Sequence, residues 1–113
     1  MTIEQFAIGY LSGRLSVPVS GSVPSPRPDR FVTVERTGGR RVNKIPSATL
    51  AVQSWAASLA DAAELNAQVE AAMEAMAAEP DISRSALDSS YNYTDEATKT
   101  PRYQAVFEVV YLF

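Results

Sequence analysis

A short alternating segment with rigid flanks constrains the fold more than any other part of the chain. Pro26 and Pro28 stiffen the approach to it, because proline fixes its own φ angle and pushes the preceding residue towards extended backbone. Between Arg30 and Arg36 the side chains then alternate, with two valines on one side and three other residues on the opposite side: Phe31, Thr33 and Glu35. This pattern predicts a β-strand.

Gly38 and Gly39 follow this segment and predict that the strand ends there, since glycine adopts backbone conformations that other residues resist. We therefore expect a loop over residues 37–47, with a basic cluster in and beside it: Arg36, Arg40, Arg41 and Lys44. Such a loop could bind DNA phosphates, but no aromatic residues are interleaved, and exposed charges are commonly just solvated. Because the whole chain is acidic, with a net charge of −3, contact with a partner protein is the favoured use.

The other periodic segments predict the remaining elements. In chain order they are a short helix within 1–14, a proline-rich extended segment over 15–29, a strand over 48–55, a long helix over 58–78, and strands over 82–93 and 102–113. The last segment is apolar on both faces, which is typical of a central strand covered on both sides. A helix between two strands indicates a crossover and hence a mixed sheet.

These elements predict one α+β domain over residues 1–113, whose sheet and long helix occupy 30–113. It should contain a mixed four- or five-stranded sheet, one long helix packed across a face, and a short N-terminal helix. The long helix has an apolar stripe that should face the core: Leu59, Ala62, Leu65, Val69, Met73 and Met76. Phe107 and Val109 should be buried with it. We expect one face of the strand over 82–93 to carry Ser85, Leu87, Ser89, Tyr91 and Tyr93.

Charge is unevenly divided along the chain. Residues 1–53 carry seven basic and three acidic side chains, whereas residues 54–113 carry three basic and ten acidic ones. This division could be an accident of a solvated surface. It also suits a subunit whose one face meets a different face of its neighbour.

The residue types argue against catalysis. The chain has neither cysteine nor histidine, which removes thiolate chemistry and the usual general base at neutral pH. Asp88, Asp95 and Glu96 are the only carboxylates whose grouping merits consideration as a metal or acid/base site. We predict no enzymatic activity, no metal and no cofactor. With no apolar run of about 18 residues and no signal-like start, we expect a cytoplasmic protein without membrane contact.

Three segments together resemble the small tail terminator (tail-completion) proteins of long-tailed phages that infect actinobacteria. They are PRPDRFVTVERTGG at 26–39, LAVQSWAASLADAAELNAQVEAAM at 50–73 and TPRYQAVFEVVYLF at 100–113. The resemblance implies a small α/β domain that forms a ring of six copies and caps the tail tube below the head. It also implies a place in the tail or neck of the virion after assembly in the host cytoplasm. The implied partners are further copies of the chain, the tail tube protein and the head–tail connector or head-closure protein.

A ring of this kind passes the genome without holding it, so its channel wall should not be basic. We therefore expect a net negative wall, with the basic cluster turned towards protein. The contributors should be among Asp61, Glu64, Glu70, Glu74, Asp88, Asp95 and Glu96. Two alternatives stay open: another phage neck protein, such as a head-closure protein or stopper, and a cytosolic adaptor that binds a peptide along a sheet edge.

Overall fold

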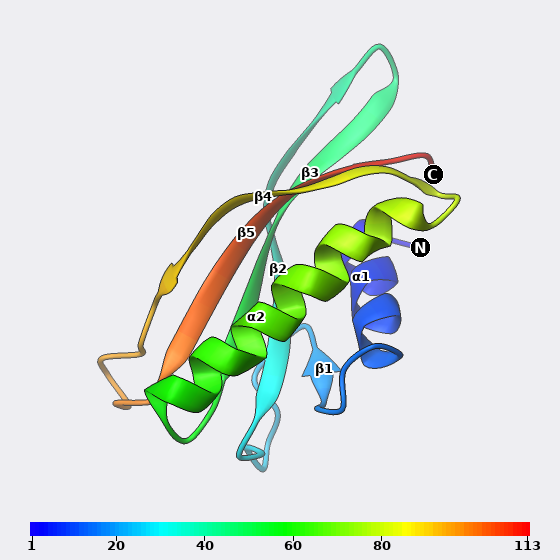
Figure 1. Cartoon of the computed structure of the whole chain (residues 1–113). Helices are drawn as coiled ribbons and strands as arrows, with labels where there is room; N and C mark the ends of the chain where they lie inside the picture. Colours follow the sequence, from blue (N-terminus) through cyan, green and yellow to red (C-terminus); the bar gives the residue numbers. More distant parts are fainter.

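A five-stranded mixed sheet forms one layer of the protein, and two helices form the other (Figure 1). The computed structural model describes all residues from 1 to 113. The strands are β1 (Val19–Ser20), β2 (Phe31–Val42), β3 (Ile45–Trp55), β4 (Ile82–Asn92) and β5 (Arg102–Tyr111). They lie in the order β1-β2-β3-β5-β4, with β1 parallel to β2 and all other neighbours antiparallel. The predicted fold class is confirmed.

Both helices begin at residues that cap them. Helix α1 (Ile3–Ser12) follows a capping box, in which Thr2 Oγ1 accepts a hydrogen bond from the Gln5 amide and Gln5 Oε1 accepts one from the Thr2 amide. Helix α2 (Leu59–Ala75) starts after Ser58, whose hydroxyl accepts a hydrogen bond of 3.2 Å from the amide of Asp61. A 3-10 turn over Met76–Ala78 (η1) completes the long helix at its predicted end.

The core lies between the helices and one face of the sheet. Phe107 and Val109 of β5 are fully buried together with Leu65 and Val69 of α2, as predicted. Helix α1 adds three buried side chains to the same cluster: Ile3, Ala7 and Leu11. Of the predicted stripe on α2, only Leu59 departs from expectation, because it lies in the first turn and is 43% exposed.

No helix covers the opposite face of the sheet, which we call the open face (Figure 1). Strand β5 is central, as predicted, but the expectation that both its faces are covered is wrong. Ala105, Phe107 and Val109 are buried against the helices, whereas Val106 and Val110 on the open face are only half-buried. The neighbouring strands β3 and β4 flank them and shield part of their surface, which explains why apolar residues are tolerated there.

The prediction that the first long strand ends at the two glycines is wrong. β2 continues to Val42 and forms a hairpin with β3, so that residues 37–47 are not a loop. The glycines instead accommodate a bulge between Arg36 and Gly38, and a Cβ atom on Gly39 would lie 2.9 Å from the carbonyl oxygen of Ser47. The hairpin turns at Asn43 and Lys44, whose φ angles of 51° and 66° are both positive, as in a type I′ turn.

A second bulge changes the faces of β4. The register shifts between Leu87 and Ser89, so Ser85 pairs with Val109 on the helix side while Tyr91 pairs with Gln104 on the open face. The expectation that Ser85 and Tyr91 share one face is therefore wrong. The extra residue at the bulge moves all later side chains of the strand to the opposite face, whereas the sequence pattern assumes unbroken alternation.

The two ends of the chain lie close together beside α1 (Figure 1). The rings of Phe6 and Phe113 have centroids 5.5 Å apart, and Phe113 also packs on Tyr111. Residues 15–29 contain only the two-residue strand β1. Three of their side chains are partly buried against the core: Leu15, Val17 and Val19.

Candidate functional site

The β2–β3 hairpin extends beyond the rest of the sheet (Figure 1). We call its residues 37–46 the arm. β3 pairs with β5 only from Ser47 onwards, and the outer edge of β2 pairs with β1 only at Val32 and Thr33. The arm is therefore held by pairing between its own two strands.

The arm brings the predicted basic cluster together. Arg40, Arg41 and Lys44 are exposed on it, and Arg36 is exposed at its base. None of them forms an ion pair, since the only ion pair in the chain joins Lys99 to Glu96 at 3.4 Å. Their few hydrogen bonds are local, such as the 3.2 Å bond from Arg36 Nε to the carbonyl of Gly38. Four positive charges thus lie on one hairpin without an ion pair to neutralise them.

A groove on the open face runs beside the arm. Its volume is about 670 Å³, and its walls come from the arm, β5 and the middle of β4. Five apolar side chains line it: Val42, Ile45, Ala86, Leu87 and Val110. Val42 and Ile45 at the arm's tip are 54% and 48% exposed. Exposed apolar side chains gathered in a concave surface are typical of a protein contact.

Charged residues of both signs also line the groove. Arg40 lies on the arm wall and Arg84 on the β4 wall, with Asp88 and Glu108 as the two acids. Glu108 accepts a hydrogen bond of 2.8 Å from the hydroxyl of Thr49, so part of its charge is already satisfied. Sequence reasoning missed this groove, because it arises where three segments far apart in the chain meet across a twisted sheet.

A row of polar side chains crosses the open face further along the strands. The Thr33 hydroxyl is 3.2 Å from Gln53 Oε1, and Gln53 Nε2 donates to Gln104 Oε1 at 2.7 Å. The amide of Gln104 in turn donates to the hydroxyl of Tyr91. One uncharged side chain from each of β2, β3, β5 and β4 therefore joins a continuous hydrogen-bonded row.

Trp55 anchors a cluster of rings and arginines at the end of the sheet away from the arm. Its ring stacks on Phe31, with centroids 5.3 Å apart, and the guanidinium of Arg102 lies 4.6 Å from the Trp55 ring and 4.4 Å from that of Tyr93. Arg27 lies 5.3 Å from the same tryptophan. Trp55 is only 3% exposed as a result, so these arginines tie the neighbouring loops to the sheet.

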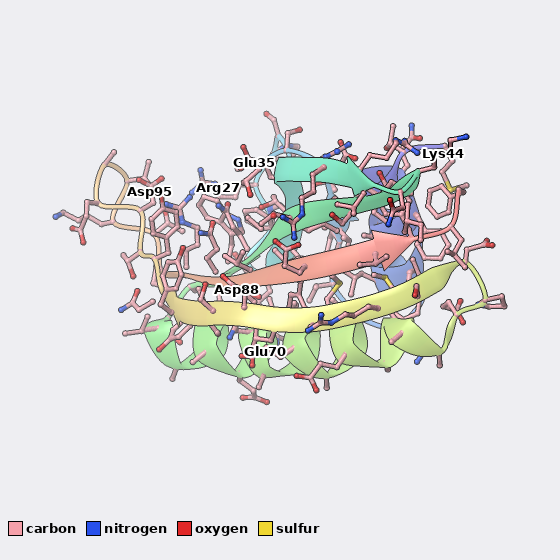
Figure 2. All side chains as sticks on the ribbon, turned by 90° about the horizontal axis from the view of Figure 1, so that it is seen from above. Arg27, Glu35, Lys44, Glu70, Asp88 and Asp95 are labelled. Carbon is pink, nitrogen blue, oxygen red and sulfur yellow. The ribbon has the colours of Figure 1, made fainter.

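The seven acids considered for a channel wall do not form one surface. Four lie on α2: Asp61, Glu64, Glu70 and Glu74. Glu70 is half-buried and accepts hydrogen bonds from Asn66 and Ser90, whereas the other three are exposed. Asp88 lies in the groove, on the other side of the sheet from Glu70, and Asp95 belongs to the loop at the far end (Figure 2).

The carboxylate cluster suggested by the sequence does not form. Asp88 and Asp95 lie well apart (Figure 2), and the structure holds no group of three or more side chains that could bind a metal ion. Asp95 instead organises its own loop, accepting hydrogen bonds from the Ala97 amide and the Thr98 hydroxyl at 3.1 and 3.0 Å. The hydrogen bond from Thr98 lowers the pKa of Asp95 below its usual value. Glu96 pairs with Lys99.

Neither α1 nor α2 has the length and hydropathy that crossing a lipid bilayer requires. No protein-family model matches the chain, and no match was found among the curated proteins.

Proposed function

We propose that the protein is a ring-forming tail terminator of a long-tailed phage, which ends growth of the tail tube and joins the tail to the head connector. The resemblance of three sequence segments suggests this role. The observation that carries the proposal furthest is the basic arm, which projects from the domain and has no acidic partner within the chain.

A ring of identical subunits needs two different surfaces that complement each other. Such head-to-tail contacts close into a ring when the rotation from one subunit to the next divides a full turn. This chain carries a basic arm at one end of its sheet and an acidic helix in the layer that packs on the sheet. The asymmetry supports contacts between unlike faces.

In this role the ring covers the open end of the tube with a surface that does not template another tube ring. Its opposite surface meets the connector or head-closure protein. The genome passes through the channel without specific binding, so the arm's arginines face protein and the channel wall is net negative. Because the seven candidate acids occupy separate surfaces, only some of them can contribute to that wall.

A stopper or head-closure protein is the second candidate, and the same arm motivates it. If Arg40, Arg41 and Lys44 pointed into the channel, they would hold DNA phosphates instead of a protein neighbour. Such a ring would retain the genome within the head. The two functions therefore place the arm on opposite sides of the ring wall.

Mass and location test the proposal. A ring of six 12.2-kDa chains would have a mass of about 73 kDa in sedimentation or light scattering, alone or with the tail tube protein. Imaging of labelled virions should place it between tube and head. A chain that stays monomeric under all these conditions, or a label in the capsid, would contradict the proposal.

Replacing Arg40, Arg41 and Lys44 together by serine tests the arm itself. The fold should stay intact, because all three side chains are exposed and none belongs to the hydrophobic core. Phage carrying this variant should accumulate headless tails or tubes of uncontrolled length. Normal particles would show that these charges are merely solvated.

A further inference from the structure

The arm together with its base carries a charge equal and opposite to that of the long helix. Residues 36–47 contain four basic and no acidic side chains, whereas residues 59–78 contain four acidic and no basic ones. Neither set is neutralised by an ion pair within the chain. If two oppositely charged surfaces of one chain cannot reach each other within that chain, they can pair only between different copies.

They do not meet within one copy. The arm projects past the end of the sheet, while α2 crosses the middle of the helix layer (Figure 1). In addition, Glu108 and Val110 of β5 line the groove, and these side chains lie on the open face, which α2 does not cover. Helix α2 of the same copy therefore cannot reach this groove, whereas helix α2 of another copy can.

We propose that helix α2 of one copy seats in the groove beside the arm of the next copy. This inference rests on the ring formation proposed above and names the two surfaces that would join its subunits. Two cations, Arg40 and Arg84, and two acids, Asp88 and Glu108, line the groove itself. The arm beside it adds the exposed Arg41 and Lys44 and carries no acid, so the positive charge of the arm complements an acidic helix.

The dimensions of the two surfaces agree. The seven residues from Gly38 to Lys44 span roughly 23 Å as extended strand. The 17 residues of α2 span roughly 26 Å as helix. An arm of this length can therefore follow most of the helix.

The side chains also suit a close contact. Paired residues of a hairpin share a face, so Arg40, Val42 and Ile45 all face the groove from the arm. On α2, the exposed Ala67, Ala71 and Ala75 form a smooth surface between acids on either side. The exposed valine and isoleucine can then pack on alanines while Arg40 reaches a carboxylate.

Joining the sheets edge to edge is the main alternative mode of self-association. Both free edges oppose it. The outer edge of β2 carries a bulge and three arginines, and β4 has register shifts at Ile82/Arg84 and at Leu87/Ser89. Bulges and charges of this kind are how natural sheets prevent strand addition. A contact through side chains is the mode that the structure favours.

Charge reversal of each surface provides the test. One variant carries Arg40→Glu, Arg41→Glu and Lys44→Glu, and the other carries Asp61→Lys, Glu64→Lys and Glu74→Lys, which makes the helix net positive and leaves the hydrogen-bonded Glu70 unchanged. We expect each to raise the concentration needed for assembly by roughly tenfold or more in sedimentation velocity at low salt. Mixing the two variants should restore assembly, since each reversed surface then meets a complementary one.

A matched control reverses two exposed acids elsewhere, with Asp29→Lys and Asp81→Lys. It should assemble like the wild type. Circular dichroism of every variant checks the fold, and recovery on mixing shows independently that the reversed chains are folded.

The outcomes separate the two proposals. If the wild-type chain assembles but the reversed variants assemble equally well, or if mixing fails to restore assembly, the groove–helix contact is wrong while the ring stands. If the wild-type chain never assembles, both the contact and the ring are wrong.

Discussion

Phe107 offers the sharpest test of the core. This side chain of β5 is fully buried, pairs across the sheet with Leu50 and Leu87, and belongs to the cluster that joins the sheet to both helices. Phe107→Ala would leave a cavity between the two layers. Backbone pairing on both sides of β5 limits how far the strand can move to fill it.

The expected loss of unfolding free energy is about 3–5 kcal/mol, as for other large-to-small core substitutions. A domain of this length has a total stability of about 6–17 kcal/mol, so the loss is a large fraction of it. With an unfolding entropy of about 0.24 kcal/mol/K, the melting temperature should fall by about 12–21 °C.

Urea denaturation followed by tryptophan fluorescence measures this loss, because Trp55 is the only tryptophan and is buried in the native state. Leu112→Ala is the control, since Leu112 lies just beyond β5 and is 59% exposed. Its effect should stay within about 0.5 kcal/mol. A loss below about 1 kcal/mol for Phe107→Ala, with an unchanged dependence on urea, would refute the assignment of this residue to the core.

Three further predictions concern local structure. Gly39→Ala should open the arm and speed its amide hydrogen exchange, because the added Cβ would lie 2.9 Å from the carbonyl oxygen of Ser47. Gly38→Ala is the control, since its Cβ would make only ordinary contacts. Equal exchange in both variants would contradict the prediction. Ser58→Ala should lower the unfolding free energy by about 1 kcal/mol through loss of the α2 cap, and an unchanged urea midpoint would argue against it. Thr98→Ala should raise the pKa of Asp95 towards its usual value in an NMR titration. Since the folded-state pKa is lowered, the loop's stabilisation by this carboxylate exists above the unfolded pKa and is lost as pH falls through the folded one.

Periodicity was sufficient to predict the helices and the core. Apolar spacing on α2 and its capping serine depend only on neighbours along the chain, and both agree with the structure. The apolar residues on both faces of the last segment also predicted that β5 is central. Two of the failures involve β-bulges, because one extra residue near Gly38 and another near Asp88 changed the pairing without leaving a periodic signal.

The candidate site was predicted only in part. Arg40, Arg41 and Lys44 were recognised because like charges close in sequence stay close in space. Their setting on a hairpin was missed, because the turn at Asn43-Lys44 has positive φ angles without the glycine that usually signals it. The groove, the polar row and the Trp55 cluster join residues from separate strands, and their assembly depends on strand order, which the sequence pattern does not specify.

The meeting of the chain's two ends at Phe6 and Phe113 has a consequence for topology. A short linker could join the ends, and new ends could be opened in the loop between Asp95 and Thr100, at the opposite end of the sheet, without cutting any strand of the five-stranded sheet. Such a circular permutant would keep the same layers while β5, rather than α1, began the chain. Fusion partners could then be attached at either end of the sheet, near the arm or far from it.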